Sequence, residues 1–274
     1  MQTKAINENV LTLRTALFES NGRDKDVTSS ISPVFMKYNR NGLEVNIEFS
    51  PKLDIDQAEW AFDLCKDSME DVYETSGYGW DDEDKRDELL GDGTRFLLVR
   101  DTQEGSETNG ELIGFVHFRF TVQGEVMEMM QGDTCIYLWD IHLEENFRRK
   151  GLGRHLLLVL ELIAAREGIK YVSVPLQNTD EASQAWLMQS KGYVPDSYLK
   201  DSLCFDAEDE GFNVYSKGIA NKVRSMGVTT PRTVPVLTSE SPQSVAVDVD
   251  LDGLCLQPKF EAGEDENSSK KEEH

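Results

Sequence analysis

The stretch 140-DIHLEENFRRKGLGRHLLLVLELIAA-165 decides the fold, because it joins a strand pattern to a helix pattern through one short basic turn. Gly151 and Gly153 remove side chains where the backbone bends and a ligand can come close. The first turn of the helix Leu152–Arg166 then leaves N–H groups without internal partners, and such groups bind phosphate readily. The sequence predicts a diphosphate-binding turn, with a solvated basic surface turn as the alternative. We call Arg148–Gly153 the glycine corner.

Strands and helices alternate on both sides of the glycine corner. The alternating apolar residues of Leu43–Phe49 predict a half-buried strand, and apolar residues at spacings of three and four after Asp54 predict a helix. The further expected elements are strands over 96–101, 112–122 and 135–143, the helix 152–166, a strand over 170–176, a helix around 180–190 and a strand near 212–217. This order is typical of an α/β sheet with helices on its faces.

Composition separates a globular centre from two polar ends. Residues 1–31 are expected to form an N-terminal extension, either a short helix or disordered, and residues 32–220 carry the α/β pattern. Residues 221–274 are predicted to be a disordered acidic tail, because they offer little apolar surface to offset the entropy of ordering. Within the tail, either 234-VPVLT-238 or 251-LDGLCLQPKF-260 is apolar enough to dock, but the sequence does not indicate which one or where.

The net charge of −23 over 274 residues argues against direct nucleic-acid binding, which needs a basic face. This acidity suits either a basic partner or simple solubility. The four cysteines form no C-x-x-C pair and the histidines are dispersed, so we expect no metal site, and we expect His142 and His117 to be structural rather than metal ligands. No apolar run reaches the roughly 20 residues that cross a bilayer, and the first residues lack a secretory pattern. We therefore expect a soluble intracellular protein without membrane contact.

The residues Arg148-Arg149-Lys150-Gly151-Leu152-Gly153 resemble the acetyl-CoA motif of the GNAT acetyltransferases, [RQ]-x-x-G-x-[GA]. The resemblance implies the GNAT fold, an α/β fold with a mixed, mostly antiparallel central sheet, a splayed central strand and flanking helices. It also implies acetyl-CoA as co-substrate, with the pyrophosphate on the turn, the pantetheine arm along the preceding strand, and no metal. The coenzyme-binding residues that it implies are Ile141, His142, Leu143, Arg148, Arg149, Lys150, Gly151, Leu152, Gly153, Arg154 and Asn178.

Other stretches within 34–217 are similar to a narrower family, the N-alpha-acetyltransferase D enzymes, which are histone-specific N-terminal acetyltransferases. These stretches are VFMKYNRNGLEVNIEF, WAFDLCKDSMEDVYETSGYGW, HFRF and FRRKGLG. The resemblance implies acetylation of the N-terminal serine of histones beginning Ser-Gly-Arg-Gly, histone four and histone two-A. Histone tails and coenzyme A are then the partners of a monomer in the cytoplasm and nucleus. Two other functions stay open: acetylation of a lysine or small-molecule amine, and non-enzymatic, acyl-CoA-dependent binding of histone tails.

Asp140 is the candidate general base, because it lies on the strand beside the expected thioester, where the family carries a glutamate. An N-terminal α-amine has a pKa near 7.7–8.0, so modest assistance through one water is enough. Trp139 and Tyr73 are the other catalytic candidates. Because Trp139 and Asp140 point to opposite faces of a regular strand, we expect a bulge where this strand splays.

The resemblance also implies an aromatic peptide pocket, and an aromatic wall would exclude bulky first residues. Its residues are Tyr73, Tyr78, Trp80, Tyr137 and Trp139. Two further substrate positions depart from the family, with Thr121 in place of an aspartate and Phe212 in place of a tyrosine. The contact with a histone arginine must then be weaker or supplied elsewhere. We expect the acidic stretch Trp80–Gly93 to be a loop that either attracts a basic tail or is only solvated.

Overall fold

The computed structural model describes residues 25–76, 79–123, 133–178, 180–196, 212–219 and 253–255. The described strands form a single nine-stranded sheet, with every pairing antiparallel except the parallel pair β5–β6. The sheet order is β1 (Lys37–Arg40), β2 (Leu43–Ser50), β3 (Arg95–Asp101), β4 (Leu112–Val122), β5 (Thr134–Leu143), β6 (Tyr171–Gln177), β8 (Phe212–Gly218) and β7 (Val194–Pro195). Outside this order, the short strand β9 (Gly253–Cys255) pairs with β5. The α/β sheet predicted from the sequence pattern and its mixed, mostly antiparallel form, which the GNAT resemblance implied, are both confirmed.

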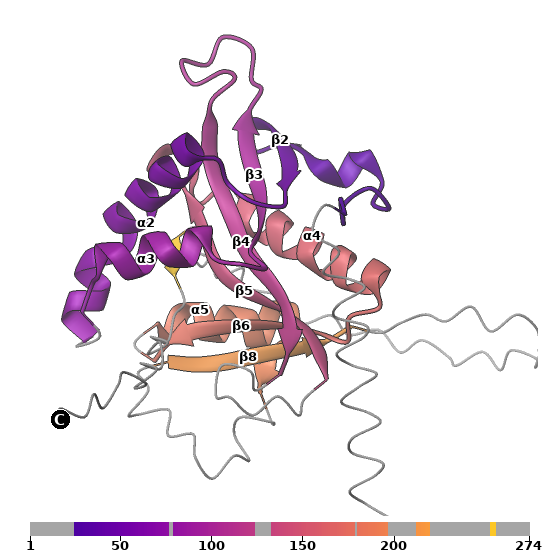
Figure 1. The fold of residues 1–274 in the computed structure, drawn as a ribbon. Helices are drawn as coiled ribbons and strands as arrows, with labels where there is room; N and C mark the ends of the chain where they lie inside the picture. Colours follow the sequence, from indigo (N-terminus) through magenta and orange to yellow (C-terminus); the bar gives the residue numbers. More distant parts are fainter. Residues whose placement is uncertain are drawn as a thin grey trace, which may run out of the picture.

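Helices cover both faces of the sheet, as Figure 1 shows, with α2 and α3 on one side and α4 on the other. The helices are α2 (Ile55–Ser76), α3 (Asp82–Leu90), α4 (Leu152–Glu167) and α5 (Glu181–Trp186), the last continuing into a π-helical turn, Leu187–Lys191. Short 3-10 helices occupy Pro33–Met36 and Glu145–Phe147. None of the helices in the described ranges is both long and apolar enough to cross a membrane.

The alternation of side chains along β3 creates two hydrophobic cores. Leu97 and Val99 belong to the core that contains the apolar face of α4, while Phe96 and Leu98 belong to the core under α2 and α3. The helix α4 buries the side chains of Leu152, Leu156, Leu157, Val159, Leu160, Ile163 and Ala164. This packing fixes the start of α4, and therefore the glycine corner, against the middle of the sheet.

The strand β5 splays from β6 as the GNAT resemblance implied. The two strands pair only over Cys135–Tyr137, whereas β4 follows β5 on its other side to Leu143. The β4–β5 register shifts between His117 and Phe118, so that His117 faces Asp140 and Phe118 faces Leu138. Trp139 is thus the extra residue of a bulge, and the bulge expected from the sequence is confirmed.

Four elements correct the predicted order, namely β1, α3, β7 and β9, and the last of these lies in the tail that was expected to be disordered. The stretch expected to be an acidic loop contains α3, whose N-cap Asp81 accepts hydrogen bonds from the backbone N–H groups of Glu83 and Asp84. The strand β1 was not predicted, and it joins β2 through a two-residue turn. Asn41 and Gly42 in this turn have φ values of 54° and 75°, the left-handed pair that an Asn-Gly hairpin adopts.

Candidate active site

The hairpin β1–β2 holds the glycine corner from outside. The Lys150 carbonyl oxygen accepts hydrogen bonds from the Tyr38 hydroxyl at 2.6 Å and from the Asn41 side-chain amide at 2.8 Å. Arg149 and Gly151 on either side of this carbonyl have φ values of 61° and 84°, a left-handed conformation that needs support at a residue with a Cβ. Tyr38 and Asn41 are functional candidates that the sequence prediction missed.

The basic residues of the glycine corner have different roles. Arg148 points inward, where its Nε donates to the Leu143 carbonyl at 2.7 Å and its Nη2 donates to the Ser68 hydroxyl at 3.1 Å. Arg148 therefore braces the corner against β5 and α2. The Lys150 ammonium lies 5.8 Å from the centre of the Phe147 ring. Arg154, one turn into α4, lines an adjoining cavity instead.

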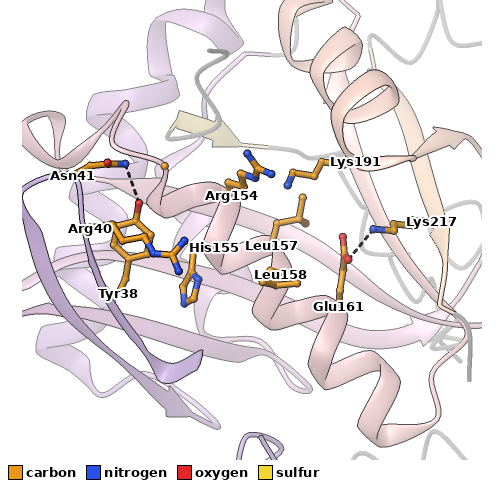
Figure 2. A pocket seen from close by; sticks show the side chains of 11 residues that line it. Tyr38, Arg40, Asn41, Arg154, His155, Leu157, Leu158, Glu161, Lys191 and Lys217 are labelled. Carbon is orange, nitrogen blue, oxygen red and sulfur yellow. Dashed lines mark hydrogen bonds and ion pairs between the residues drawn. The ribbon is translucent and has the colours of Figure 1, made fainter. Parts of the chain in front are cut away.

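This cavity, which we call the basic pocket, has a volume of about 690 Å³ (Figure 2). It lies between the β1–β2 turn, the outer face of α4 and the ends of the π-helical turn and β8. The lining residues are Tyr38, Arg40, Asn41, Gly151, Arg154, His155, Leu157, Leu158, Glu161, Lys191 and Lys217. Glu161 is paired with Lys217 at 2.8 Å, so Arg40, Arg154 and Lys191 give the pocket a net positive charge. The pocket is open to an anionic ligand beside the glycine corner.

Asp140 lies at the centre of a buried cluster, with no exposed surface. Its Oδ1 accepts from the Lys85 ammonium at 2.8 Å, and its Oδ2 lies 2.9 Å from Nδ1 of His117. Burial acts to raise the pKa of Asp140, but the Lys85 ammonium and the bonds from His117 and His142 outweigh it and hold that pKa well below its ordinary value. Asp140 is thus ionised and a weak proton acceptor by itself. We call Lys85, Glu88, His117, Asp140 and His142 the Asp140 cluster.

Glu88 balances the charge of the cluster. Its Oε1 lies 2.7 Å from the Lys85 ammonium, and its side chain is only 15% exposed. Burial raises the pKa of Glu88 to about 8, against the opposing effect of Lys85. Near neutral pH the carboxyl is therefore largely protonated, which leaves one cation, Lys85, and one anion, Asp140. The helix α3 supplies both Lys85 and Glu88, so the misassigned acidic stretch contributes directly to the site.

His117, which was expected to be structural, is hydrogen-bonded to Asp140. Burial lowers the pKa of His117 to about 4, so the ring is neutral at pH 7. Ionised Asp140 accepts a hydrogen bond only from a protonated Nδ1. The neutral ring therefore carries its proton on Nδ1 and has a lone pair on Nε2. That nitrogen is buried and has no hydrogen-bond partner among the described residues. The ring is stacked on Phe96 at 4.8 Å and on Trp139 at 6.2 Å.

Two sets of possible metal ligands meet at Asp140, one with Cys65 and His142 and one with Glu88 and His117. The fold assembles these groups from separate elements, which is why dispersed residues in the sequence did not indicate them. The Lys85 ammonium already compensates the Asp140 carboxylate at 2.8 Å. The geometry therefore gives no reason to assign a metal to the Asp140 cluster.

The predicted aromatic residues form two groups. On α2, Tyr73 is buried and packs edge-on against Trp80, with ring centres 5.6 Å apart, while the Trp80 indole N–H donates to Asp82 at 2.7 Å. On β5, Tyr137 and Trp139 pack edge-on at 5.3 Å beside the Asp140 cluster. Tyr78 lies outside the described residues.

The remaining predicted positions lie on other strands. Thr121 is buried opposite Cys135, towards the start of β5 and away from Asp140. Phe212 is buried on β8 opposite Gln177, at the end of β6 that has splayed from β5. Asn178 follows Gln177 and accepts from the side chain of Asn213 at 2.5 Å. Phe212 and Asn178 therefore lie at the splayed end of the sheet, and Thr121 does not.

Residues 61–193 match the model of the acetyltransferase (GNAT) family. A GNAT-family acetyltransferase from Listeria monocytogenes is 17% identical, covers 66% of this chain and 99% of its own, and superposes with a TM-score of 0.47. Arabidopsis thaliana NAA60 in complex with acetyl-CoA is 15% identical, with coverages of 64% and 99% and a TM-score of 0.45. The ribosomal-protein-S18-alanine N-acetyltransferase of Escherichia coli is 15% identical, with coverages of 66% and 99% and a TM-score of 0.42. These identities are too low to carry an acceptor from those enzymes to this chain. The family match covers just under half of the chain, and this part of the chain is similar to the GNAT acetyltransferases, which use acetyl-CoA as co-substrate.

Proposed function

We propose that this protein is an N-terminal acetyltransferase that transfers the acetyl group of acetyl-CoA to the N-terminal serine α-amine of histones beginning Ser-Gly-Arg-Gly, histone four and histone two-A. The proposal rests on the hydrogen-bonded pair of Asp140 and His117, which lies beside Trp139. Asp140 and Trp139 are on β5, the strand that leads into the glycine corner. A proton-accepting pair and an aromatic wall thus lie where the coenzyme's reactive end is expected.

The coenzyme is held at its phosphate end by the start of α4. The backbone N–H groups of Leu152 and Gly153 lie in the first turn, where they have no partner within the helix, and the positive end of the helix dipole adds to their attraction for phosphate. Arg154 and the basic pocket beside it receive the remaining negative charge of the nucleotide end. The pantetheine arm then runs back along β5 towards Asp140.

The acetyl transfer itself needs one proton acceptor. The amine nitrogen forms a bond to the thioester carbon, and the carbon–sulfur bond breaks with its electron pair on sulfur, so that coenzyme A leaves as the thiolate. The amine loses one proton as its nitrogen becomes acidic. His117 Nε2 has the available lone pair, and Asp140 holds the ring in that tautomer. Burial lowers the pKa of His117 to about 4 and makes the ring alone a weak proton acceptor, and the adjacent Asp140 carboxylate opposes this effect by stabilising the charge that forms. Because both side chains are buried, a single bridging water carries the proton from the amine. Asp140 thus keeps its proposed catalytic role and acts through His117.

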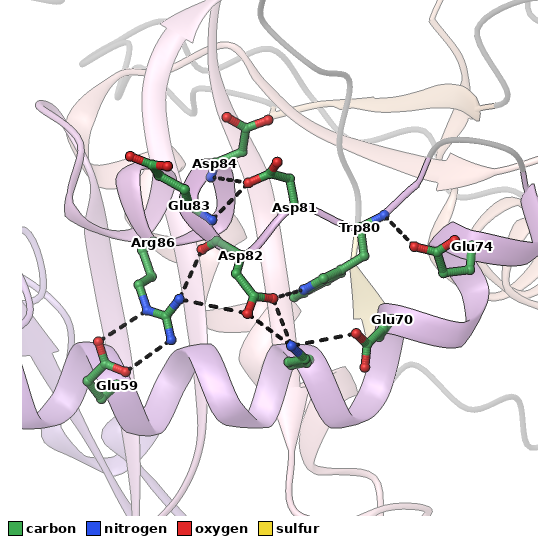
Figure 3. A network of polar contacts seen from close by, with 10 residues as sticks. Glu59, Glu70, Glu74, Trp80, Asp81, Asp82, Glu83, Asp84 and Arg86 are labelled. Carbon is green, nitrogen blue, oxygen red and sulfur yellow. Dashed lines mark hydrogen bonds and ion pairs between the residues drawn. The ribbon is translucent and has the colours of Figure 1, made fainter.

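The acceptor side of the site is acidic, as a basic histone tail requires. Figure 3 shows Asp81, Glu83 and Asp84 at the start of α3, next to Trp80. Asp82 is occupied by the Lys66 ammonium and the Trp80 indole, which fix the aromatic wall in place. The exposed carboxylates of Glu83 and its neighbours attract a basic peptide and leave recognition of the first residue to the aromatic side chains.

The departure at Thr121 favours one alternative, a lysine acceptor, because a buried hydroxyl cannot pair with a histone arginine as a carboxylate does. Three peptides distinguish the two functions: SGRGKGGK, the same peptide with a blocked α-amine, and a peptide with a bulky first residue. The proposal predicts turnover of the first peptide alone. Comparable turnover of the blocked peptide would instead identify a lysine acetyltransferase.

A further inference from the structure

The strand β9 occupies the edge of β5 that β6 leaves open. Beyond Tyr137, β5 has no pairing with β6, while its other edge is taken by β4. On this open edge, β9 runs antiparallel to β5, with Cys255 opposite Asp140, Leu254 opposite Ile141 and Gly253 opposite His142. The same short strand also lies against α2, and Figure 1 shows it in yellow beside that helix. A segment from the far end of the chain is therefore inserted next to Asp140.

The same edge is where the proposed function places the pantetheine arm. The glycine corner begins five residues after Leu143, so a ligand with its diphosphate on α4 reaches Asp140 only by running back along β5. The pantetheine arm contains two amide groups, which can bond to an unpaired strand edge as a peptide backbone does. The backbone groups of Asp140, Ile141 and His142 cannot pair with both at once.

We propose that the open edge of β5 is a binding site for the chain's own segment Gly253–Cys255, and that this segment and the pantetheine arm of the coenzyme occupy it in turn. This inference rests on the proposed position of acetyl-CoA. The segment then competes with the coenzyme and covers the approach to Asp140 while it is bound. The sequence indicated that 251–260 could dock but not where. The proposal places residues 253–255 of this stretch on the open edge of β5.

The extent of the pairing suits a reversible occupant. Only three residues of β9 pair with β5, so the contact is short and a larger ligand with a diphosphate anchor can displace it. The segment is covalently attached, so it acts at an effective concentration set by the connection and not by the protein concentration. Residues 220–252 connect it to the domain, 33 residues whose extended length exceeds 100 Å at roughly 3.3 Å each. Release therefore requires no rearrangement of the sheet.

Coenzyme binding by the full-length protein tests the proposal. Leu254→Pro removes the backbone N–H of the central residue of β9 and restricts its φ, which disfavours the strand. Ser244→Pro places the same substitution in the connecting stretch, leaves Gly253–Cys255 unchanged and is the matched control. Isothermal titration with acetyl-CoA, without any acceptor, should give a Kd three- to tenfold lower for Leu254→Pro, because the site is no longer shared. The Ser244→Pro protein should stay within twofold of the unmodified protein.

A synthetic peptide, DLDGLCLQP (residues 250–258) under reducing conditions, provides the second arm. Added to the Leu254→Pro protein, it should restore the higher Kd competitively, whereas the peptide with proline in place of its central leucine should not. Hydrogen exchange of 138–143 without coenzyme should be faster in Leu254→Pro than in Ser244→Pro.

An unchanged or higher Kd for Leu254→Pro would overturn the proposal, because β9 would then be a permanent strand or irrelevant to the edge. Since no acceptor is present, a failure of histone acetylation leaves this test intact. If no variant binds acetyl-CoA, the proposed function fails together with the competition.

Discussion

Lys85 pairs with both Glu88 and Asp140. The charges of these three side chains sum to about zero only while Glu88 is protonated. A folded-state pKa of about 8, against an ordinary value of 4.5, means that folded Glu88 holds a proton that the unfolded chain has already released between these values. The stability that this group contributes is therefore fully present below pH 4.5 and is lost as the pH rises through about 8.

The variant Glu88→Gln tests this charge balance. Gln resembles protonated glutamate and does not ionise, so the unfolding free energy of the variant should not follow this loss. From pH 5.5 to pH 8.5 the stability of the variant relative to the unmodified protein should rise by about 3 kcal/mol, since each pH unit between the two pKa values corresponds to about 1.4 kcal/mol. Urea unfolding at the two pH values measures the difference. Parallel pH profiles for the two proteins would show that Glu88 is ionised in the folded state.

The pair of His117 and Asp140 makes a second prediction at the residue scale. Either Asp140→Asn or His117→Gln should lower kcat on a histone-type peptide by about 10²–10⁴, the usual contribution of a positioned proton acceptor. The Kd for acetyl-CoA should change less than threefold. Asp71→Asn, an exposed carboxylate on α2, is the control and should be unaffected. Equal losses of coenzyme binding and kcat would assign the pair a structural role.

Sequence reasoning selected part of this site, for reasons that are local. Asp140 and Trp139 stand next to the glycine corner, and strand alternation alone required the bulge that the structure contains. Lys85 lies 55 residues from Asp140, so their ion pair depends on tertiary contact between α3 and β5. His117 is bonded to Asp140 only because the bulge places the two opposite each other across the β4–β5 pair.

Two hydrogen bonds between elements shape the glycine corner, since Tyr38 and Asn41 both donate to the Lys150 carbonyl. Tyr38→Phe removes one donor, and Asn41→Gly removes the other while keeping a residue that accepts the left-handed φ. Each bond is worth about 1 kcal/mol, so each variant should raise the Kd for acetyl-CoA by roughly fivefold. Asn39→Ala, exposed on the same strand, is the control for isothermal titration. An unchanged Kd in the double variant would show that the corner is rigid without the hairpin.

At the element scale, the sequence predicted best where apolar periodicity was strong. The strands β3, β4 and β5 and the helix α4 were found because buried faces leave a regular pattern. The helix α3 was missed because charged residues dominate it and only its Leu89 and the stem of Lys85 are buried. The strand β1 has four residues, too few for a period, although its Asn-Gly turn was a visible hairpin signal.

The charges of the whole molecule are segregated, with a basic pocket beside the glycine corner and acidic residues at the start of α3. If the acidic residues attract the acceptor, Glu83→Gln combined with Asp84→Asn should raise the KM for SGRGKGGK by three- to tenfold at low salt and leave acetyl-CoA binding unchanged. The control pair Glu104→Gln and Glu107→Gln removes the same charge from the exposed β3–β4 loop. A KM that is insensitive to both pairs, or to salt, would assign the acidity to solubility alone.

Long-range pairing limited what the sequence could give for the molecule as a whole. Apart from β1, α3, β7 and β9, the order of strands and helices followed from periodicity, and the splayed central strand followed from the family resemblance. Gly253–Cys255 pairs with β5 beside Asp140 although the two segments are more than 100 positions apart in the sequence. This pairing is made by backbone groups, so the side-chain sequence carries no pattern from which it could be predicted.

The position of the transferred acetyl group tests the central claim most directly. The full-length protein is incubated with isotopically labelled acetyl-CoA and the peptide SGRGKGGK, which offers one α-amine and two lysine side chains in the same molecule. Tandem mass spectrometry then locates the label. The proposed function predicts a single acetyl group on the N-terminal serine with both lysines unmodified, and label on a lysine with an unmodified N-terminus would contradict it.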